Sequence, residues 1–135
     1  MPSNKHSSLT TVRRRTAQRA GERGEHVAAL WLRSKGYRIL KRRYRVPMGE
    51  IDLIARRGSI VAFVEVKTRR LATASAGSEW VSAHQWHRVG RAAGLFLGRY
   101  ADASGQALVL SARFDLMIIQ PWRLPRHVRD VWRPS

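Results

Sequence analysis

The chain has 135 residues and no cysteine, and its 26 Lys and Arg against nine Asp and Glu give a net charge of +17. This length supports one hydrophobic core, and the lack of cysteine excludes disulfides, thiolate metal sites and cysteine nucleophiles. No apolar run reaches the roughly 18 residues of a membrane helix, and the first residues lack an apolar signal core, so we expect a cytoplasmic protein with no membrane partner. Because the net charge is strongly positive, we also expect a polyanionic partner, most simply nucleic acid.

The predicted elements alternate between helix and strand. Residues 16–35 carry apolar side chains at helical spacing, and Gly36 is placed to end that helix as a C-cap. The second and third strands are apolar on both sides, which is typical of strands covered by helices. In chain order we expect a basic arm at 1–15, a helix at 16–35, strands at 37–46, 50–56 and 59–68, a loop at 71–78, a helix at 81–100, a turn at 102–106 and a strand within 108–119.

This order, α-β-β-β-α-β, predicts an α/β fold with a mixed β-sheet flanked by helices. Trp86 fits the apolar period of the second helix and is expected in the core, whereas Trp122 and Trp132 could stack on bases or pack over the sheet. Asp115 is expected to cap its strand or to pair with Arg113. The domain boundaries are an arm at 1–15, a folded domain at 16–120 and a basic tail with two Trp residues at 121–135.

Three of the nine acidic residues lie in two neighbouring apolar runs, so their charges need compensation. A charged side chain in a half-buried strand is costly unless it is paired, hydrogen-bonded or bound to a cation. Side chains alternate faces along a strand, so Glu50 shares a face with Asp52, and Glu65 shares a face with Lys67 on the next strand. Acids gathered in this way suggest a shared divalent cation, and oxygen ligands favour Mg²⁺ or Mn²⁺.

The hairpin turn between these strands determines how the acids meet. If Arg57 and Gly58 are its two loop residues, Glu50 lies opposite Glu65, and Asp52 is a diagonal neighbour of Glu65 on the same face. A loop of odd length would shift this register.

An Asp followed about a dozen residues later by Glu-x-Lys on a neighbouring strand resembles the active site of the PD-(D/E)XK nuclease superfamily, which includes restriction endonucleases and archaeal Holliday junction resolvases. A longer pattern is more specific and resembles the YraN family of endonuclease-like bacterial proteins over residues 20–119. That pattern reads Gly21-x-x-Gly24-Glu25-x-x-Ala28-x-x-x-Leu32-x-x-x-Gly36-Tyr37-x-Ile39-Leu40, Gly49-Glu50-Ile51-Asp52-Leu53-Ile54-Ala55 and Phe63-Val64-Glu65-Val66-Lys67-Thr68-Arg69, with Arg88, Ala92-Ala93 and Arg113-Phe114-Asp115.

The resemblance implies a restriction-endonuclease-like or resolvase-like core that hydrolyses phosphodiester bonds, with branched or single-stranded DNA favoured over RNA. By position, Asp52, Glu65 and Glu25 match the metal-binding acids and Lys67 matches the motif lysine, so these four are the candidate catalytic residues. Glu50 belongs to the motif and is a further candidate. The implied cofactor is Mg²⁺ or Mn²⁺, as one ion or two, and analogy with resolvases suggests a homodimer.

Nucleic-acid contacts are expected from basic residues beside the acidic strands, because clustered cations neutralise phosphates. Gln85 is a departure, because the family commonly has Lys at its apparent position; this weakens the carry-over of a substrate contact, but related nucleases use Gln near there, so Gln85 is included. The candidates are Arg42, Arg43, Arg45, Arg69, Arg70, Gln85 and Arg88.

These residues also have structural explanations. Glu25 could be a surface acid of its helix, Glu50 could pair with Arg45 or Arg43, and Lys67 could be the solvated end of a strand. For the whole chain, the alternatives to a nuclease are a catalytically silent nucleic-acid-binding module and an interaction protein in a DNA or RNA maintenance assembly. The presence of both strand acids and the motif lysine favours the nuclease.

Overall fold

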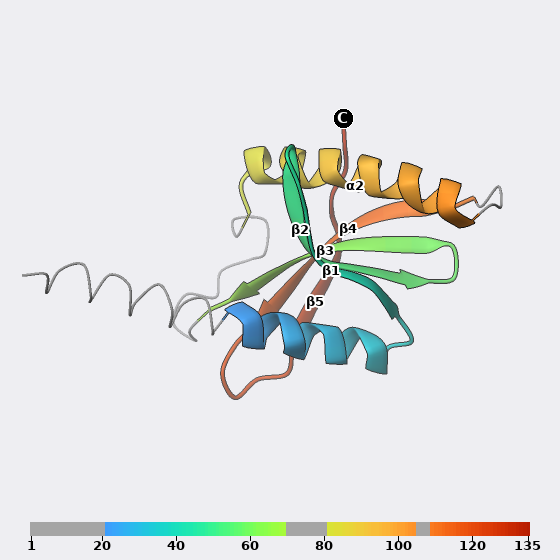
Figure 1. Cartoon of the computed structure of the whole chain (residues 1–135). Helices are drawn as coiled ribbons and strands as arrows, with labels where there is room; N and C mark the ends of the chain where they lie inside the picture. Colours follow the sequence, from blue (N-terminus) through green and yellow to red (C-terminus); the bar gives the residue numbers. More distant parts are fainter. Residues whose placement is uncertain (1–20, 70–80, 105–108) are drawn as a thin grey trace, which may run out of the picture.

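The computed structural model describes residues 21–69, 81–104 and 109–135, in which a five-stranded sheet lies between two helices (Figure 1). The N-terminal helix occupies residues 21–34 of the described ranges. The other elements are β1 (Arg38–Val46), β2 (Gly49–Arg57), β3 (Ile60–Thr68), α2 (Ala83–Ser104), β4 (Ser111–Ile119) and β5 (Arg126–Trp132). The predicted α/β fold with a mixed sheet flanked by helices is therefore confirmed. Within the described ranges, neither helix has the length and apolar character needed to cross a membrane.

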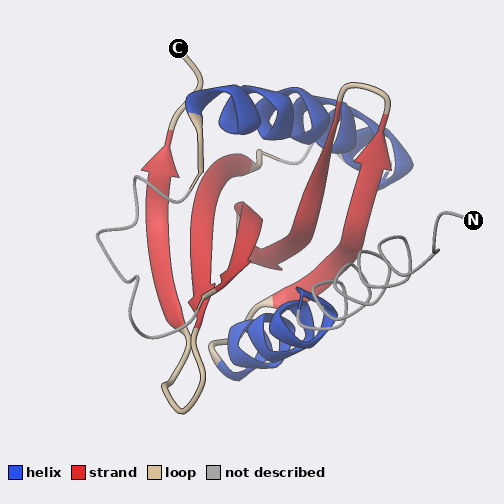
Figure 2. Cartoon of the chain, turned by 90° about the vertical axis from the view of Figure 1, so that its left-hand side faces the viewer, coloured by secondary structure: helices blue, strands red, loops and turns tan. Residues whose placement is uncertain are grey.

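The strands follow the order β1-β2-β3-β4-β5 across the sheet. Neighbouring strands are antiparallel except β3 and β4, which are parallel. A parallel pair needs a crossover connection, and α2 lies in the connection between β3 and β4. Figure 2 shows that α2 covers one face of the sheet and the N-terminal helix covers the other.

Each helix seals its own half of the hydrophobic core against the sheet. The half under α2 contains Trp86, Val89, Ala92 and Ala93 of the helix together with Ile51, Ile54, Val61, Phe63, Phe114, Leu116 and Ile118. The half under the N-terminal helix contains Ala28, Ala29 and Leu32 together with Tyr37, Leu53, Ala55, Ala62, Val64 and Met117. Trp86 is therefore a core residue, as its helical spacing predicts.

Glycine and a hydroxyl set the ends of these elements. Gly36 has a φ of +89°, and the N–H of Tyr37 donates to the carbonyl of Leu32 at 3.0 Å. This hydrogen bond satisfies a carbonyl at the C-terminal end of the N-terminal helix, so the predicted C-cap at Gly36 is confirmed. At the start of α2, the Ser82 hydroxyl accepts a 3.1 Å hydrogen bond from the N–H of Gln85.

Strand β5 is absent from the predicted order, because the sequence pattern predicts only a tail over residues 121–135. In the structure β5 pairs antiparallel with β4, and the indole of Trp132 stacks on that of Trp86 with centroids 6.0 Å apart. Trp132 thus packs over the sheet, whereas Trp122 is 99% exposed. As an edge strand with several exposed residues, β5 carries a basic pattern with little apolar signal.

Two further boundaries differ or lie outside the described residues. Helix α2 continues to Ser104, four residues beyond the predicted end, so the predicted turn begins too early. The predicted arm at 1–15 and the predicted loop at 71–78 lie outside the described residues.

Candidate active site

Strands β2 and β3 separate at the end of the sheet where their acidic residues lie. The ladder between them ends at the pair Leu53 and Val64. Beyond this pair, residues 49–51 continue to pair with β1, and residues 65–68 continue to pair with β4. We call this opening, formed by residues 49–52 and 65–68, the β2–β3 fork. Because Asp52 and Glu65 are the first residues past the ladder, both acids sit where the fork opens.

The β2–β3 hairpin turns at Gly58 and Ser59, and the predicted loop of Arg57 and Gly58 is wrong. Gly58 has a φ of +61°, a backbone conformation that glycine adopts without strain. The observed register of β2 and β3 is displaced by two residues from the predicted one. Continued one step beyond the pair Leu53 and Val64, it aligns Asp52 with Glu65 instead of placing them diagonally. A displacement of two keeps the side-chain parity, and the two acids remain neighbours.

Asp52 points into the fork because the alternation of β2 is broken around it. Ile51 packs under α2 and Leu53 packs under the N-terminal helix, although strict alternation would place both on one face. The Oδ2 atom of Asp52 accepts a 2.8 Å hydrogen bond from the N–H of Val66. The carboxylate therefore takes up a β3 backbone donor at the point where the ladder has ended.

Glu65 is 3% exposed and faces the first turn of α2. Its Oε2 atom accepts a 2.9 Å hydrogen bond from Nε2 of Gln85. Burial raises the pKa of Glu65 to about 8, and the negative charge of Asp52 adds to the rise. Gln85, expected from the sequence to contact nucleic acid, donates this hydrogen bond to one of the two fork acids.

The pKa of Asp52 is also raised, to about 6, and burial is again the largest cause. The hydrogen bond from Val66 lowers this pKa, the negative charge of Glu25 raises it, and the positive charge of Lys67 lowers it. Lys67 lowers the pKa of Glu65 as well. The motif lysine is thus electrostatically coupled to both fork acids, without forming an ion pair with either in the described structure.

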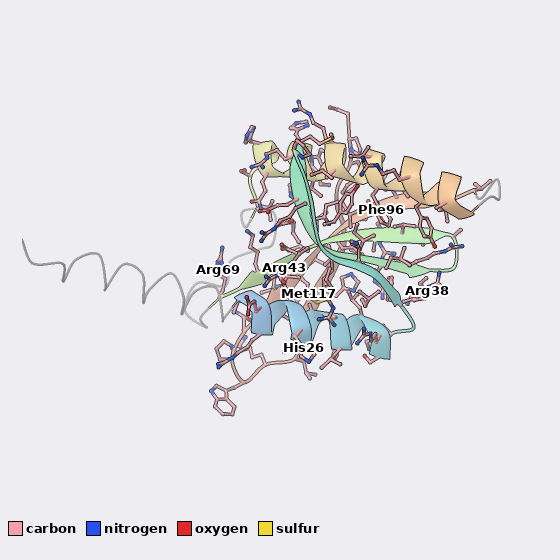
Figure 3. All side chains as sticks on the ribbon, in the orientation of Figure 1. His26, Arg38, Arg43, Arg69, Phe96 and Met117 are labelled. Atoms are coloured by element: carbon pink, nitrogen blue, oxygen red, sulfur yellow. The ribbon has the colours of Figure 1, made fainter. Side chains whose placement is uncertain are left out.

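Glu25 lies on the N-terminal helix and is held by an arginine. The Nε atom of Arg43 donates to its Oε2 at 2.8 Å, and Arg43 also lies 3.4 Å from Glu22. Figure 3 places Arg43 and Arg69 toward the same end of the molecule, away from Arg38. Glu25 therefore lies near the fork, with its charge compensated by Arg43.

The predicted metal trio is not assembled as a ligand set. In the ranges that the structure describes, no group of three or more His, Cys, Asp or Glu side chains is arranged to hold a metal ion. Asp52 and Glu65 nevertheless each retain a carboxylate oxygen with no hydrogen bond from those ranges. Oxygen donors of this kind fit Mg²⁺ or Mn²⁺, and Glu25 could serve as a third ligand only by leaving Arg43.

The α2 side of the fork opens into a cavity of about 200 Å³ lined by Glu50, His84, Gln85 and Arg88. Glu50 is exposed, and its carboxylate lies 3.5 Å from Arg45, so the predicted alternative pairing of Glu50 is confirmed. Among the other predicted nucleic-acid contacts, Arg42, Arg69 and Arg88 have exposed side chains, and Arg70 lies outside the described residues.

A family model described as "Uncharacterised protein family UPF0102" matches residues 24–119. The chain belongs to the UPF0102 family. This is the YraN family that its motifs resemble, and the matched range contains every predicted catalytic residue.

The UPF0102 chain also resembles curated proteins over most of its length. It is 46% identical over 121 residues to a UPF0102 protein of Paramagnetospirillum magneticum, and this alignment covers 87% of this chain and 89% of that protein. It is 45% identical over 126 residues to a UPF0102 protein of Rhizobium johnstonii, and this alignment covers 93% of this chain and 98% of that protein. These names establish the family and state no activity.

A second buried acid in the UPF0102 chain has a different environment. Asp115 is fully buried and accepts hydrogen bonds from Arg113 at 2.8 Å and from the Asp130 N–H at 3.0 Å, and it lies 2.7 Å from Nε2 of His127. Burial alone would raise the pKa of Asp115, but these hydrogen bonds outweigh it and hold that pKa below its usual range. The predicted pairing with Arg113 is confirmed, and the cluster joins β4 to β5.

Sequence reasoning missed two parts of the site. The Val66 donor is a backbone group, which no residue type reveals. The capture of Glu25 by Arg43 depends on a residue of β1 with a φ of +50°, and no sequence pattern predicts that backbone conformation. Gln85 could be named from the sequence, because it stands at the apparent position where the family commonly has Lys.

Proposed function

We propose that this UPF0102 protein is a metal-dependent endonuclease that hydrolyses phosphodiester bonds in nucleic acid, with DNA as its preferred substrate. One observation carries the proposal. The structure describes seven acidic side chains, and five of them pair with Arg or His: Glu22, Glu25, Glu50, Asp115 and Asp130. Asp52 and Glu65 form no such pair in the described ranges, although the chain has 26 Lys and Arg.

This lack of a cationic partner matters because both acids are largely removed from water. A buried carboxylate without such a partner carries a desolvation penalty, which raises the pKa values of Asp52 and Glu65. A divalent cation between them would offset that penalty, and cations of this kind activate water and stabilise charge on phosphoryl oxygens. The two acids are therefore suited to act as ligands of a cation.

The surrounding residues have defined positions in this proposal. The backbone of Val66 fixes the Asp52 carboxylate, and the amide of Gln85 fixes that of Glu65. Lys67 lies on the same strand as Glu65 and would orient the attacking water or stabilise the charge of the phosphoryl transition state. The net charge of +17 supports attraction of a polyanionic substrate.

The second candidate function is a catalytically silent nucleic-acid-binding module. The ion pair between Arg43 and Glu25 favours this module, because it engages the carboxylate of Glu25, which would otherwise complete the ligand set. Such a module would keep the basic surface and the fold without cleaving.

Cleavage assays distinguish the two functions. Purified wild type should cleave at least one of a set of branched, flapped, single-stranded and duplex DNAs in Mg²⁺ or Mn²⁺. Asp52→Asn and Glu65→Gln should abolish cleavage, and Lys67→Ala should reduce it while sparing metal affinity. Glu22→Gln is the matched control, since Glu22 is an exposed acid outside the fork, and it should cleave like wild type.

DNA affinity at low salt separates loss of chemistry from loss of binding. Glu65→Gln should bind DNA as tightly as wild type or more tightly, because its neutral amide never presents to the phosphate the negative charge that an ionised Glu65 presents. A folded wild type that cleaves none of the substrates would favour the silent module. Equal residual cleavage in wild type, Asp52→Asn and Glu65→Gln would identify a contaminating nuclease and refute the assignment of the fork.

A further inference from the structure

A second cavity lies beside the fork on the side of the N-terminal helix. It has a volume of about 430 Å³, and the loop between β4 and β5 forms one of its walls. Its apolar lining comes from Val27, Ile119 and Pro121, and its polar lining includes Arg23, Gln120 and Arg123. We call it the β4–β5 loop pocket. It has room for a small planar ring system.

Gln120, which lines this pocket, has a side-chain amide nitrogen with no hydrogen-bond partner in the described ranges. This Nε2 atom is buried. A buried amide without a partner costs about 1 to 3 kcal/mol, so such a group calls for an explanation. A turn of the Gln120 side chain toward the pocket that it lines would let a ligand carbonyl or ring nitrogen accept this hydrogen bond.

An exposed aromatic side chain stands next to the same pocket. Trp122 lies between the lining residues Pro121 and Arg123, is 99% exposed and has a φ of +62°. A fully solvated indole held in an unusual backbone conformation is a feature of recognition sites more than of packing. Its planar face could stack on a base at the mouth of the pocket.

Chain geometry links this pocket to the acids. Thr68, three residues after Glu65 on β3, lines the pocket, and so does Gly24, which directly precedes Glu25. A Cβ at Gly24 would clash with the Thr68 hydroxyl, so the helix and β3 are in close contact here. At a rise of about 3.3 Å per residue, Thr68 lies roughly 10 Å along the strand from Glu65. Glu65 faces α2 and Thr68 faces the N-terminal helix, so a nucleic-acid strand would pass around the open end of the sheet to place a phosphate at the fork and a neighbouring nucleotide at the pocket.

We propose that the β4–β5 loop pocket receives an unpaired base of the nucleic-acid strand whose phosphate lies at the β2–β3 fork. This inference rests on the proposed function and specifies its substrate as a strand with at least one unpaired nucleotide. The apolar walls accommodate the ring, Gln120 reads its hydrogen-bonding edge, and Arg23 and Arg123 attract the flanking phosphates. A base paired within a duplex presents no free ring to the pocket, which excludes uninterrupted duplex as the best substrate.

The test is a binding measurement without metal, so that cleavage does not enter. Dissociation constants in EDTA are measured by fluorescence anisotropy for a labelled single DNA strand and for the same strand with abasic nucleotides. Both strands carry equal backbone charge, so their ratio reports contacts to bases alone. Wild type should bind the strand with bases at least about fivefold more tightly than the abasic strand. A fivefold difference corresponds to about 1 kcal/mol, the lower end of what stacking of one base contributes.

Four variants locate the contact. Gln120→Met keeps the size of the side chain and removes its donor, and Trp122→Ala removes the exposed ring; both should lower the ratio of dissociation constants. Arg123→Ala should weaken both strands alike and leave the ratio unchanged. Leu124→Ala is the matched control, because Leu124 is 78% exposed in the same loop and does not line the pocket.

Two outcomes would overturn the inference: a wild-type ratio near one, or an unchanged ratio in both Gln120→Met and Trp122→Ala. The first needs no variant, so misfolding cannot obscure it. A protein that cleaves DNA but shows a ratio near one would refute the base pocket and leave the nuclease intact. A protein with the expected ratio but no cleavage would refute the nuclease and support the pocket.

Discussion

Glu65→Gln should stabilise the folded protein at high pH and have little effect at low pH. The pKa of the Glu65 carboxyl is raised from 4.5 to about 8 in the folded state. The folded state therefore holds this proton more tightly than the unfolded chain does. Its contribution to stability is fully present below pH 4.5 and is lost as the pH rises through about 8. The introduced amide would resemble the protonated acid in shape and in lack of charge, and it would not titrate.

The size of the effect follows from the two pKa values. At about 1.4 kcal/mol per pH unit of difference, ionising Glu65 destabilises the fold by at most about 5 kcal/mol above pH 8. Asp52, whose pKa is raised to about 6, causes a similar fall at lower pH in wild type and variant alike. The stability difference between the two proteins should therefore open mainly between about pH 5 and pH 8.

Urea unfolding at several pH values in EDTA measures this difference. Glu22→Gln serves as the control and should follow the wild-type curve, because Glu22 is exposed and paired with Arg43. Adding Mn²⁺ at about pH 8 should raise the midpoint of wild type more than that of Glu65→Gln, since the cation compensates the ionised carboxylate. A constant difference between wild type and Glu65→Gln across the whole range would refute the electrostatic account of the fork.

Three other changes test the surrounding structure. Asp115→Asn should destabilise the fold by about 3 to 5 kcal/mol in urea unfolding at neutral pH, because it leaves the largely buried Arg113 guanidinium without its carboxylate partner. This deficit should shrink as the pH falls below the usual Asp range, where wild type loses the same charge. Gly49→Ala should cost about 1 to 3 kcal/mol in the same assay, because its Cβ would clash with the Arg88 carbonyl. Arg43→Ala should raise Mn²⁺ affinity about fivefold in calorimetry by releasing Glu25 from a pair worth roughly 1 kcal/mol, and unchanged affinity would show that Glu25 is no ligand.

The fold could be predicted from the sequence wherever one face or both faces of an element are apolar. The two helices, β1 to β4 and the cap at Gly36 all have such signals, and the structure contains each of them. β5 could not be predicted, because its position at the sheet edge leaves many of its side chains in water. Its place depends instead on contacts from distant residues, namely the Trp86 ring and the Asp115 cluster.

The residues of the candidate site could be predicted from the sequence, but the contacts between them could not. Apolar neighbours on both sides mark Asp52 and Glu65 as buried acids, and the structure buries Glu65 almost completely. The register depends on which two residues form the turn, and the choice between Arg57 and Ser59 has no strong local signal. The ion pair between Arg43 and Glu25 joins residues 18 positions apart on different elements, so only the tertiary structure reveals it.

Asp115 shows why an apolar context alone does not identify a site. It lies in a strand as apolar as β3, and the argument from burial applies to it with equal force. Its partners distinguish it: cationic and backbone donors surround Asp115 and lower its pKa, whereas Asp52 and Glu65 receive one neutral hydrogen bond each and have raised pKa values. In a chain with so many arginines, two adjacent acids, the buried Glu65 and the partly buried Asp52, have no cationic partner in the described ranges. The choice of partner therefore separates the acid that stabilises the fold from the two that we propose as ligands of a cation.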